Sequence, residues 1–420
     1  MTKLRQPVWL KPEEVPALPE GWRAMATEDA CVQLKPGKLF ETKTVSETGE
    51  VPVLNQSEDN FLGYHDEEPG VYASPEKPVV TFANHTCAMR LMKQPFSTIQ
   101  NIFPKVGKPD VTDTVYFYYA SLGRVGLSDY KGHHPIFRLT HIPVPPMPVQ
   151  RRIASILSAY DELIENSQQR IRILETMARA LYREWFVHFR FPGHETHTRV
   201  PSPLGNIPQG WEVRPLESLM ADHIGGGWGK DTADDNHTNP AWVIRGTDIP
   251  DARSSQVKNV PHRYHTQSNL RSRKLAAGDI LFEVSGGSKG QLVGRTLLIT
   301  PELMSAFDGD VICASFCKRI RPNTASYGAE LLYLSFLEAY ESGEIEQFQV
   351  QSTGISNFKW TEYIAKTERV IPPEPLRSRF REQVVPLFTQ IAMLGLQIQN
   401  LRRTRNLLLP RLLSGQVNLP

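Results

Sequence analysis

Two segments of the chain carry apolar residues at alternating steps of four and three positions, which is the spacing of a coiled-coil helix. The first stripe runs from Ile153 to Trp185 and the second from Phe380 to Leu412, and one polar residue interrupts each of them. Pro386 lies within the second stripe, so that helix is expected to start late or to kink there. We expect the helix seams to consist of Ile153, Leu157, Ile164, Ile171, Leu174 and Leu181 in the first segment, and of Val384, Leu387, Ile391, Leu394, Ile398, Leu401 and Leu408 in the second.

Both stripes follow a pair of prolines at the same distance. Pro145-Pro146 precede the first stripe and Pro372-Pro373 precede the second, and the prolines and the stripes are both offset by 227 residues. Prolines end the preceding strand and allow a helix to begin just after them. A single stripe would be explained by a helix packed on its own domain. Two stripes in one phase favour helices that pack on each other, antiparallel because a domain intervenes, as a spacer roughly 50 Å long.

The segments before the two stripes also begin alike. Leu18-Pro19-Glu20-Gly21-Trp22 returns as Ile207-Pro208-Gln209-Gly210-Trp211, and each opens a polar, strand-rich stretch that ends at the prolines. We call each stretch a head. The sequence therefore predicts a first head at 1–146, a spacer helix at 147–190, a linker rich in proline and glycine at 191–206, a second head at 207–373 and a second spacer helix at 374–420.

Both heads contain short β-prone runs bounded by turn residues, which are typical of strands. The expected strands are 51–54, 79–83 and 115–119 in the first head, and 242–245, 279–284 and 295–299 in the second. The segment 330–342 is expected to form a helix. The predicted class is α+β: two mixed heads with curved sheets, separated by two long antiparallel coiled-coil helices.

Composition and cysteine usage fit a soluble protein. A length of 420 residues suggests two or three domains, and 40% hydrophobic with 22% charged residues is usual for a globular chain. No apolar run approaches the roughly 20 residues of a membrane span, and charges and prolines fill the first 20 residues, so we expect a cytoplasmic protein that contacts no membrane. The four cysteines form no Cys-x-x-Cys pair and are expected to be buried free thiols, with no bound metal.

The net charge is only +2, so the local balance is more informative than the total. Between Trp242 and Lys274 the chain carries seven basic residues against Asp248 and Asp251. Such a patch can follow a phosphate backbone, although a solvated basic face explains it equally well.

Three motifs suggest catalysis but lack essential parts. Asn239-Pro240-Ala241-Trp242 lacks the second proline of the amino-methyltransferase signature, and turn chemistry explains it. Residues 225–230, Gly-Gly-Gly-Trp-Gly-Lys, fail the spacing of a phosphate-binding loop, although their backbone could approach a DNA phosphate. Asp279 and Glu283 could form paired carboxylates, but the Glu-x-Lys arrangement of common nucleases is absent. We therefore predict a chain without its own catalytic centre.

The candidate DNA contacts are basic or amide side chains near glycine-rich turns. The run Ser285-Gly286-Gly287-Ser288-Lys289-Gly290-Gln291 follows a predicted strand, so its glycines could approach phosphate while side chains reach base edges. A flexible hairpin tip is an equally good interpretation. The predicted contacts are Lys289, Gln291 and Arg295, then Lys230 and Arg245, and in the first head Arg90, Lys93 and Lys105.

The chain resembles the specificity subunits of type I restriction–modification enzymes. The resemblance is carried by the proline-rich segment 142–146, by Gln150-Arg151-Arg152-Ile153-Ala154, by the run 175–187 that begins Glu-Thr-Met-Ala-Arg-Ala-Leu, by Ala277-Gly278-Asp279-Ile280-Leu281, and by the ending 409–415. It spans nearly the whole chain and is weakest within the heads. The second helix departs from the pattern, because 375–380 lacks the glutamine that the family has beside its basic residues.

The resemblance implies two target-recognition domains, each of which reads half of a bipartite site in double-stranded DNA. It also implies that the two helices dock two methyltransferase subunits, and that a translocating nuclease subunit joins the complex. S-adenosylmethionine, ATP and Mg²⁺ would then bind those partners, and this chain would bind no cofactor. Two alternatives from other classes are a stand-alone methyltransferase or nuclease, and a coiled-coil scaffold without DNA affinity.

Overall fold

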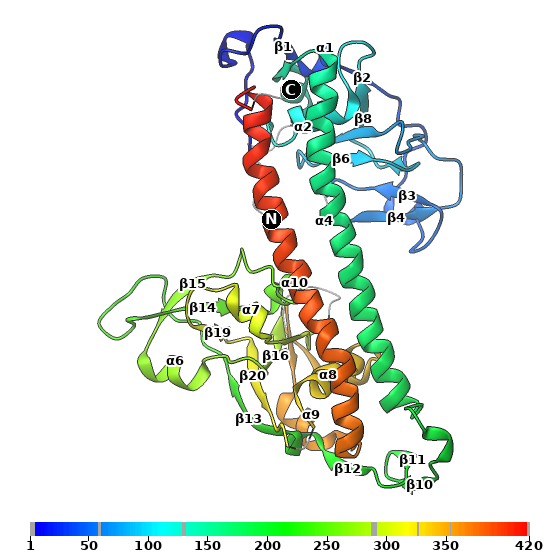
Figure 1. Cartoon of the computed structure of the whole chain (residues 1–420), viewed down its shortest axis with the longest axis vertical. Coiled ribbons are helices and arrows are strands. Elements are labelled where there is room, and N and C mark those ends of the chain that lie inside the picture. Colours follow the sequence, from blue (N-terminus) through cyan, green and yellow to red (C-terminus); the bar gives the residue numbers. More distant parts are fainter. Residues whose placement is uncertain are drawn as a thin grey trace. The chain divides into compact units, whose positions relative to one another are not determined.

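The structure is a computed structural model that describes residues 5–57, 60–127, 132–286, 292–325, 327–352 and 354–417. It has the expected α+β class, with small sheets and two long helices, α4 (Met147–Tyr182) and α10 (Glu374–Leu413), drawn in green and red in Figure 1. The chain forms two compact units, one of Met1–Ile164 with Leu401–Pro420 and one of Glu165–Asn400. Each long helix therefore contributes residues to both units.

The first unit contains two sheets that cover its core. An antiparallel sheet has the order β2-β8-β5-β6, and a smaller sheet has the order β4-β3-β7 with β3 and β7 parallel. The strands are β2 (Cys31–Gln33), β3 (Val51–Leu54), β4 (Phe61–His65), β5 (Val79–Ala83), β6 (Met89–Met92), β7 (Ser97–Thr98) and β8 (Ile102–Gly107). The short helices are α1 (Thr27–Ala30), α2 (Thr114–Ser121) and α3 (His134–Leu139).

The prediction of a strand at 115–119 is wrong, because these residues lie in helix α2. The Asp113 side chain caps the helix by accepting hydrogen bonds from the backbone N–H groups of Val115 and Tyr116, at 2.9 and 3.0 Å. The helix is buried on most sides, so its apolar residues form a continuous run. A short continuous run does not distinguish a buried strand from a buried helix.

The second unit contains a four-stranded antiparallel sheet, β13-β20-β16-β18, and two three-stranded sheets, β15-β14-β19 and β17-β22-β21. The strands are β13 (Met220–Gly225), β14 (Asn239–Ile244), β15 (His262–His265), β16 (Ile280–Glu283), β17 (Ser285–Gly286), β18 (Thr296–Leu298), β19 (Val311–Cys313), β20 (Cys317–Pro322), β21 (Gln349–Ser352) and β22 (Ile355–Phe358). The helices are α5 (Ile249–Ala252), α6 (Gln267–Arg273), α7 (Pro301–Ser305), α8 (Ala329–Glu341) and α9 (Trp360–Lys366). The segment predicted as a linker is folded, since β10 (Arg199–Ser202) and β11 (Gly205–Pro208) form a hairpin there.

The strand that opens each head pairs with the strand that closes it. In the first head β1 (Arg23–Ala26) is antiparallel to β9 (His141–Val144), and in the second β12 (Glu212–Pro215) is antiparallel to β23 (Glu368–Ile371). The residue after the tryptophan pairs in both heads with the residue before the proline pair, as Arg23 with Val144 and as Glu212 with Ile371. The sequence repeat is therefore a repeat of backbone register.

The turns before the opening strands are also equivalent. The backbone N–H of Trp22 donates to the carbonyl of Pro19 at 3.1 Å, and that of Trp211 donates to Pro208 at 3.1 Å. The glycine before each tryptophan has a left-handed conformation, with φ of 81° and 86°. A type II turn requires this conformation at its third residue, which explains the Gly-Trp pair in both motifs.

The departure from the family pattern in the second helix has a structural counterpart. Gln150 is buried, and its side chain accepts from the backbone N–H of Asp113 at 2.9 Å and donates to the carbonyls of Val111 and Pro145. At the equivalent position 227 residues later, Arg377 donates to the carbonyl of Ala325 at 3.2 Å. In both halves a side chain in the first turn of the long helix therefore ties the helix to a loop of the preceding head.

Within the unit 165–400, the start of α10 shares one core with the end of α4 and with the π-helical turn η3 (Arg183–Val187) that follows α4. Phe380 is fully buried, and its ring centroid lies 5.5 Å from that of Trp185 and 4.7 Å from that of Phe186. Val384, on the next turn of α10, belongs to the same cluster. These aromatic contacts attach the start of α10 to η3, which directly follows α4.

The start of α4 and the end of α10 share a core in the other unit, which makes the helices antiparallel. Leu157 on α4 and Leu412 on α10 belong to one buried cluster. Arg405, the polar residue that interrupts the second stripe, forms an ion pair with Asp161 of α4. The second carboxylate oxygen of Asp161 accepts a hydrogen bond from the Tyr119 hydroxyl at 2.6 Å. The interruption is therefore a satisfied polar contact within the seam.

Helix α10 differs from two expectations. It begins at Glu374 and continues through Pro386, so it does not start late. It also contains an 18-residue window with a mean hydropathy of 1.2, of which a third is buried, and by length and composition this window could span a membrane. That is weak support for a membrane span, because the core helix of a soluble protein passes the same test. Val384, Ile391 and Ile398 of this helix are buried in the protein.

The aromatic cluster gives a test of the helix pairing. Phe380→Ala removes a fully buried ring and leaves a cavity, so it should lower the free energy of unfolding by about 3–5 kcal/mol. Gln397→Ala, at an exposed position of the same helix, is the matched control and should change stability little. Thermal unfolding followed by circular dichroism measures both, and equal melting temperatures for the two variants would contradict the packing.

Candidate nucleic-acid interface

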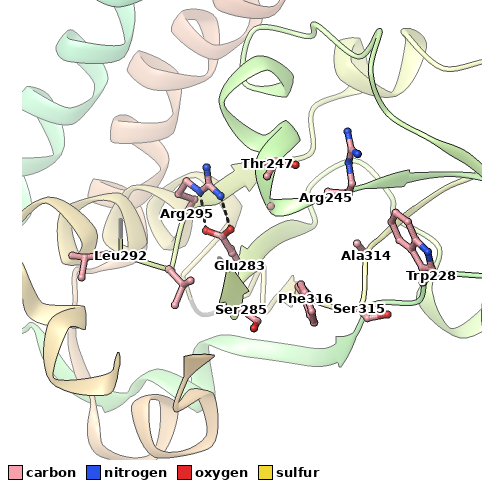
Figure 2. A pocket seen from close by; sticks show the side chains of 13 residues that line it. Trp228, Arg245, Thr247, Glu283, Ser285, Leu292, Arg295, Ala314, Ser315 and Phe316 are labelled. Atoms are coloured by element: carbon pink, nitrogen blue, oxygen red, sulfur yellow. Dashed lines mark hydrogen bonds and ion pairs between the residues drawn. The ribbon is translucent and has the colours of Figure 1, made fainter. Parts of the chain in front are cut away.

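A cavity of about 590 Å³ in the second head brings together two of the predicted DNA contacts, Arg245 and Arg295. It is bounded by the end of β14, by β16 and β17, and by the turn between β19 and β20. In the view of Figure 2, Trp228 lies on one side, the pair of Arg295 and Glu283 lies on the other, and Phe316 lies at the lower edge. The lining is therefore mainly apolar, with charged groups at defined points.

Arg295 is held by Glu283 through two parallel hydrogen bonds. Its Nε and Nη2 atoms donate to the two carboxylate oxygens at 2.8 and 2.5 Å. The Glu283 side chain is only 2% exposed, and these hydrogen bonds raise the pKa of Arg295. A Cβ atom on Gly246 would lie 2.3 Å from the Glu283 carboxylate, so the glycine makes room for the pair. Arg295 is thus a fixed guanidinium, in contrast to a mobile surface cation.

Arg245 is fixed in a similar way by an acidic residue three positions later. Its Nε and Nη2 atoms donate to the carboxylate of Asp248 at 2.9 and 2.7 Å, and Nη2 also donates to the carbonyl of Asn259 at 2.9 Å. The hydrogen bonds that Arg245 donates to Asp248 raise the pKa of Arg245. The Arg245 side chain is 38% exposed, so part of it faces solvent at the cavity.

Lys230 lies at the surface beside the glycine-rich segment. Its Nζ atom is 2.5 Å from a carboxylate oxygen of Asp234, and the side chain is 54% exposed. The hydrogen bond from Lys230 is the main reason that the pKa of Asp234 is lowered. An exposed pair of this kind is weak, so Lys230 can exchange its carboxylate partner for a phosphate.

Part of the backbone of the glycine-rich segment 225–230 is already engaged within the second head. The N–H groups of Gly226 and Gly227 donate to the carbonyls of Cys317 and Cys313, both at 2.9 Å. A Cβ atom on Gly226 would lie 2.1 Å from the carbonyl oxygen of Ala314. These glycines therefore allow the segment to pack against the turn between β19 and β20.

Two exposed aromatic residues at the cavity were not predicted. Trp228 is 41% exposed, and the Arg263 guanidinium lies 4.3 Å from the centroid of its ring. Phe316 is 55% exposed, while its carbonyl accepts hydrogen bonds from the N–H groups of Val284 and Ser285 at 2.9 and 3.2 Å. Both rings are presented on fixed backbone, and exposed aromatics on rigid turns mark interaction sites.

Two further predicted contacts, Lys289 and Gln291, lie outside the described residues. The structure therefore gives no position for them, and their assignment stays a prediction.

Two of the DNA contacts predicted in the first head, Arg90 and Lys93, interact with different neighbouring segments. Arg90 lies on β6, and its guanidinium donates to the carbonyls of Ser57 and Asn60 at 2.7 and 2.5 Å. Lys93 lies at the surface, and its Nζ atom is 3.2 Å from a carboxylate oxygen of Glu162 on α4. Both side chains are tied to neighbouring segments of the same unit.

The prediction that Lys105 contacts DNA is at odds with its burial. The residue is 2% exposed on β8, its Nζ atom donates to the Gln33 side chain at 3.0 Å, and burial lowers its pKa. A phosphate could reach this amino group only if the first head opened. Lys105 is therefore part of the core of the first head, where its chain packs beside Phe137.

Side chains of the motifs that suggested catalysis form hydrogen bonds within the fold. Asn239 and Trp242 lie on β14, where the Trp242 indole N–H donates to Asp308 at 2.9 Å. Asp279 accepts two hydrogen bonds from Arg321, both at 2.9 Å, just as Glu283 accepts two from Arg295. Both carboxylates of the proposed acidic pair are thus engaged by arginines. Within the part of the chain that the structure describes, no cluster of three histidine, cysteine, aspartate or glutamate side chains is positioned to hold a metal ion.

The cysteine thiols of the second head are inert by position. Cys313 and Cys317 are fully buried, and burial raises the pKa of Cys313 to about 12. Cys31 is also buried, and Cys87 is half-buried. All four cysteines are free, as the sequence predicted.

Comparisons with known proteins connect this arrangement to a family. Residues 19–176 match the family model described as the type I restriction modification DNA specificity domain. The specificity subunit of the MjaIX type I restriction enzyme from Methanocaldococcus jannaschii is 26% identical over 348 residues, which cover 78% of this chain and 74% of the relative. The MjaVIII specificity subunit of the same organism is 33% identical over 85 residues, or 20% of this chain and 19% of that relative.

A solved structure shares the fold. The crystal structure of the S subunit of a type I restriction–modification system from M. genitalium aligns with a TM-score of 0.56 at 12% identity, covering 95% of this chain and 97% of the other.

The buried ion pair can be tested independently of any ligand. Arg295→Ala leaves the Glu283 carboxylate buried without its partner, so the second unit should lose about 3–5 kcal/mol of stability. Replacement of both residues by methionine removes the uncompensated charge and should recover most of the loss. Urea unfolding of the single and double variants measures the difference, and a double variant no more stable than Arg295→Ala would argue against this interpretation.

Proposed function

Since this chain is a relative of the DNA specificity subunits of type I restriction–modification enzymes, we propose that it is the subunit that reads the DNA sequence for such an enzyme and has no catalytic role itself. Each head reads one half of a bipartite site in double-stranded DNA, and the two long helices separate the heads. The reaction on the DNA is then carried out by partner subunits.

The repeated frame of the heads is the observation that carries the proposal. Both heads open with the same turn, close with the same strand pairing and continue into a long helix, while the segments in between differ in length and in sheet arrangement. Two domains that bind different half-sites need the same attachment to the helices but different DNA-binding segments. The repeated turn, strand pairing and helix provide that attachment, and the segments between the paired strands differ. The specificity-domain match, at residues 19–176, covers most of the first head and most of α4. The equivalent pairing of β12 with β23 repeats that frame in the second half.

The cavity region of the second head supports the proposal of DNA contact. Arg245 and Arg295 line the cavity, and the exposed Lys230 follows Trp228 by two residues. Lys230 suits a phosphate contact, since phosphate contacts position a protein on DNA without reading its sequence. The fixed guanidinium groups suit base recognition, where geometry determines specificity. In the first head, Arg90 and Lys93 are the corresponding candidates.

Partner docking is proposed at the outward faces of the long helices. Ile173 and Met177 on α4 and Met393 and Leu407 on α10 are more than half exposed, although their helices bury other apolar residues in the seam. Exposed apolar side chains of this kind suit a protein interface. We assign these faces to two methyltransferase subunits, with a nuclease and translocase subunit joining the complex. S-adenosylmethionine, ATP and Mg²⁺ would bind those partners, in the cytoplasm where the DNA is.

A binding and methylation experiment tests the function. The chain, with its methyltransferase partner, should bind one split sequence in a gel-shift assay on mixed duplexes, and host DNA should lose methylation at that sequence when the chain is removed. A chain that binds S-adenosylmethionine on its own would instead favour a stand-alone methyltransferase. A chain that binds the methyltransferase but retards no duplex would favour a scaffold.

The spacer role gives a geometric prediction. Insertion of seven residues into α4 after Ile164 and into α10 after Asn400 lengthens each helix by roughly 10 Å. At a rise of about 3.4 Å per base pair, the gap in the methylated site should grow by about three base pairs. Seven residues inserted after Leu204, in the turn of the β10–β11 hairpin, are the control and should leave the gap unchanged. Sequencing of methylated host DNA reads the gap, and an equal gap for the helix-insertion variant and the hairpin-insertion control would reject the spacer role.

A further inference from the structure

We infer that the cavity of the second head receives a single nucleobase that has been swung out of the bound duplex. The inference rests on the proposed function, because it requires that the second head binds DNA, and it adds a binding mode for one base of the site. It is carried by the shape of the cavity, by the two aromatic rings beside it and by the charge-neutral pair of Arg295 and Glu283 within it.

The concave shape favours a protruding ligand. Base edges in an intact duplex lie at the bottom of a groove, so a protein reads them with side chains that project outward. A cavity of about 590 Å³ is instead suited to a group of the ligand that projects into the protein. Its size is within the roughly 300–1,000 Å³ range of sites that enclose small ligands. A base extruded from the helix is the part of DNA that fits this description.

The aromatic residues provide surfaces for stacking. Trp228 lines the cavity, is 41% exposed and has the Arg263 guanidinium 4.3 Å from its ring centroid, so the exposed part of the ring can stack on a planar ligand. Phe316 is 55% exposed on a turn whose backbone is fixed to β17, so its ring is held in position without being buried. Stacking of a base on an aromatic side chain is favourable, so it offsets part of the cost of unstacking the base from the duplex.

The charges favour a neutral base over a phosphate or another anion. Arg295 is neutralised by Glu283 and Arg245 by Asp248, so each cation among the described lining residues already has a carboxylate partner. Arg295 uses Nε and Nη2 for Glu283, and within the described residues Nη1 donates no hydrogen bond. Its N–H groups can therefore donate to a ligand acceptor. A guanine presents two adjacent acceptors, O6 and N7, that match the parallel donors of a guanidinium.

An apolar partner fits the cavity less well. A hydrocarbon side chain would cover the donors of Arg295 without accepting a hydrogen bond, and an unsatisfied buried donor is costly. The hydroxyl of Ser285, which donates to the Asn357 side chain at 2.7 Å, adds a further polar point to the lining. A planar ring with polar edges satisfies both the aromatic and the polar parts of the site.

Mismatched duplexes distinguish an extruded base from a base read inside the helix. A mismatch removes part of the cost of unpairing, so it strengthens binding where a base is swung out and weakens binding where a paired base is read. We expect one guanine of the methylated site, other than the base that the methyltransferase itself extrudes, at which a mismatch tightens binding about tenfold. Fluorescence anisotropy of the chain with its methyltransferase, measured on duplexes with one mismatch at each position, provides the dissociation constants.

Variants of Trp228 and Phe316, which we call the rim of the cavity, test whether the tighter binding to a mismatched duplex depends on the cavity. Trp228→Ala and Phe316→Ala remove exposed rings, so the fold should be kept, and unchanged thermal unfolding confirms it. Each should abolish the tightening at that one position and leave the response to mismatches elsewhere unaltered. Ile355→Ala, at an exposed apolar residue of the same head that does not line the cavity, is the matched control and should keep the tightening.

The outcomes separate this inference from the proposed function. Specific binding without any tightening mismatch, or tightening that persists in both rim variants, overturns the extruded base and leaves the function intact. Competition by free guanosine that is lost in the rim variants, without any tightening mismatch, would make the cavity a nucleoside site and would also overturn it. Absence of specific binding to any duplex rejects the function and the inference together.

Discussion

The antiparallel pairing of an opening strand with a closing strand holds each head together at its base. Backbone hydrogen bonds between β1 and β9, and between β12 and β23, bring the two ends of a long intervening segment to neighbouring positions. The proline pair then ends the closing strand, and the long helix starts from a fixed point. The segment between the strands can therefore change its length and its sheets without changing where the helix begins. The side chains of Gln150 and Arg377 reinforce this connection in their respective halves.

The same arrangement explains why the heads could diverge while the helices kept one phase. A helix seam depends on residues at a fixed spacing, so insertion or loss of a single residue there would rotate the apolar face away from its partner. A head is attached only through its paired strands and its contact with the helices, so its interior is under no such periodic constraint. The one polar position of the second seam, Arg405, is accommodated because it pairs with Asp161, whose other carboxylate oxygen accepts a hydrogen bond from Tyr119.

The sequence predicted what depends on local periodicity and missed what depends on distant contacts. The helix stripes and the repeated turns are local, and both are present in the structure. The run 115–119 was assigned to a strand because a buried helix and a buried strand have the same apolar composition. Arg245 and Arg295 could be selected as cations, but the partner of Arg295 is twelve positions away on another strand, and Trp228 and Phe316 meet the cavity from separate loops. Lys105 was selected for its charge, whereas the fold of β8 turns it inward.

The first unit is built from two separate stretches of the chain, which affects the order in which the two units can fold during synthesis. Its core includes Leu409 and Leu412, which belong to the last residues of α10, whereas residues 165–400 of the other unit form one continuous stretch. During synthesis the ribosome releases the second unit's residues before it has made the leucines that complete the first. The head made first is therefore finished last, and until then it exposes apolar surface to chaperones and proteases. Trimming of the chain after residue 400 would harm the head at the opposite end of the sequence.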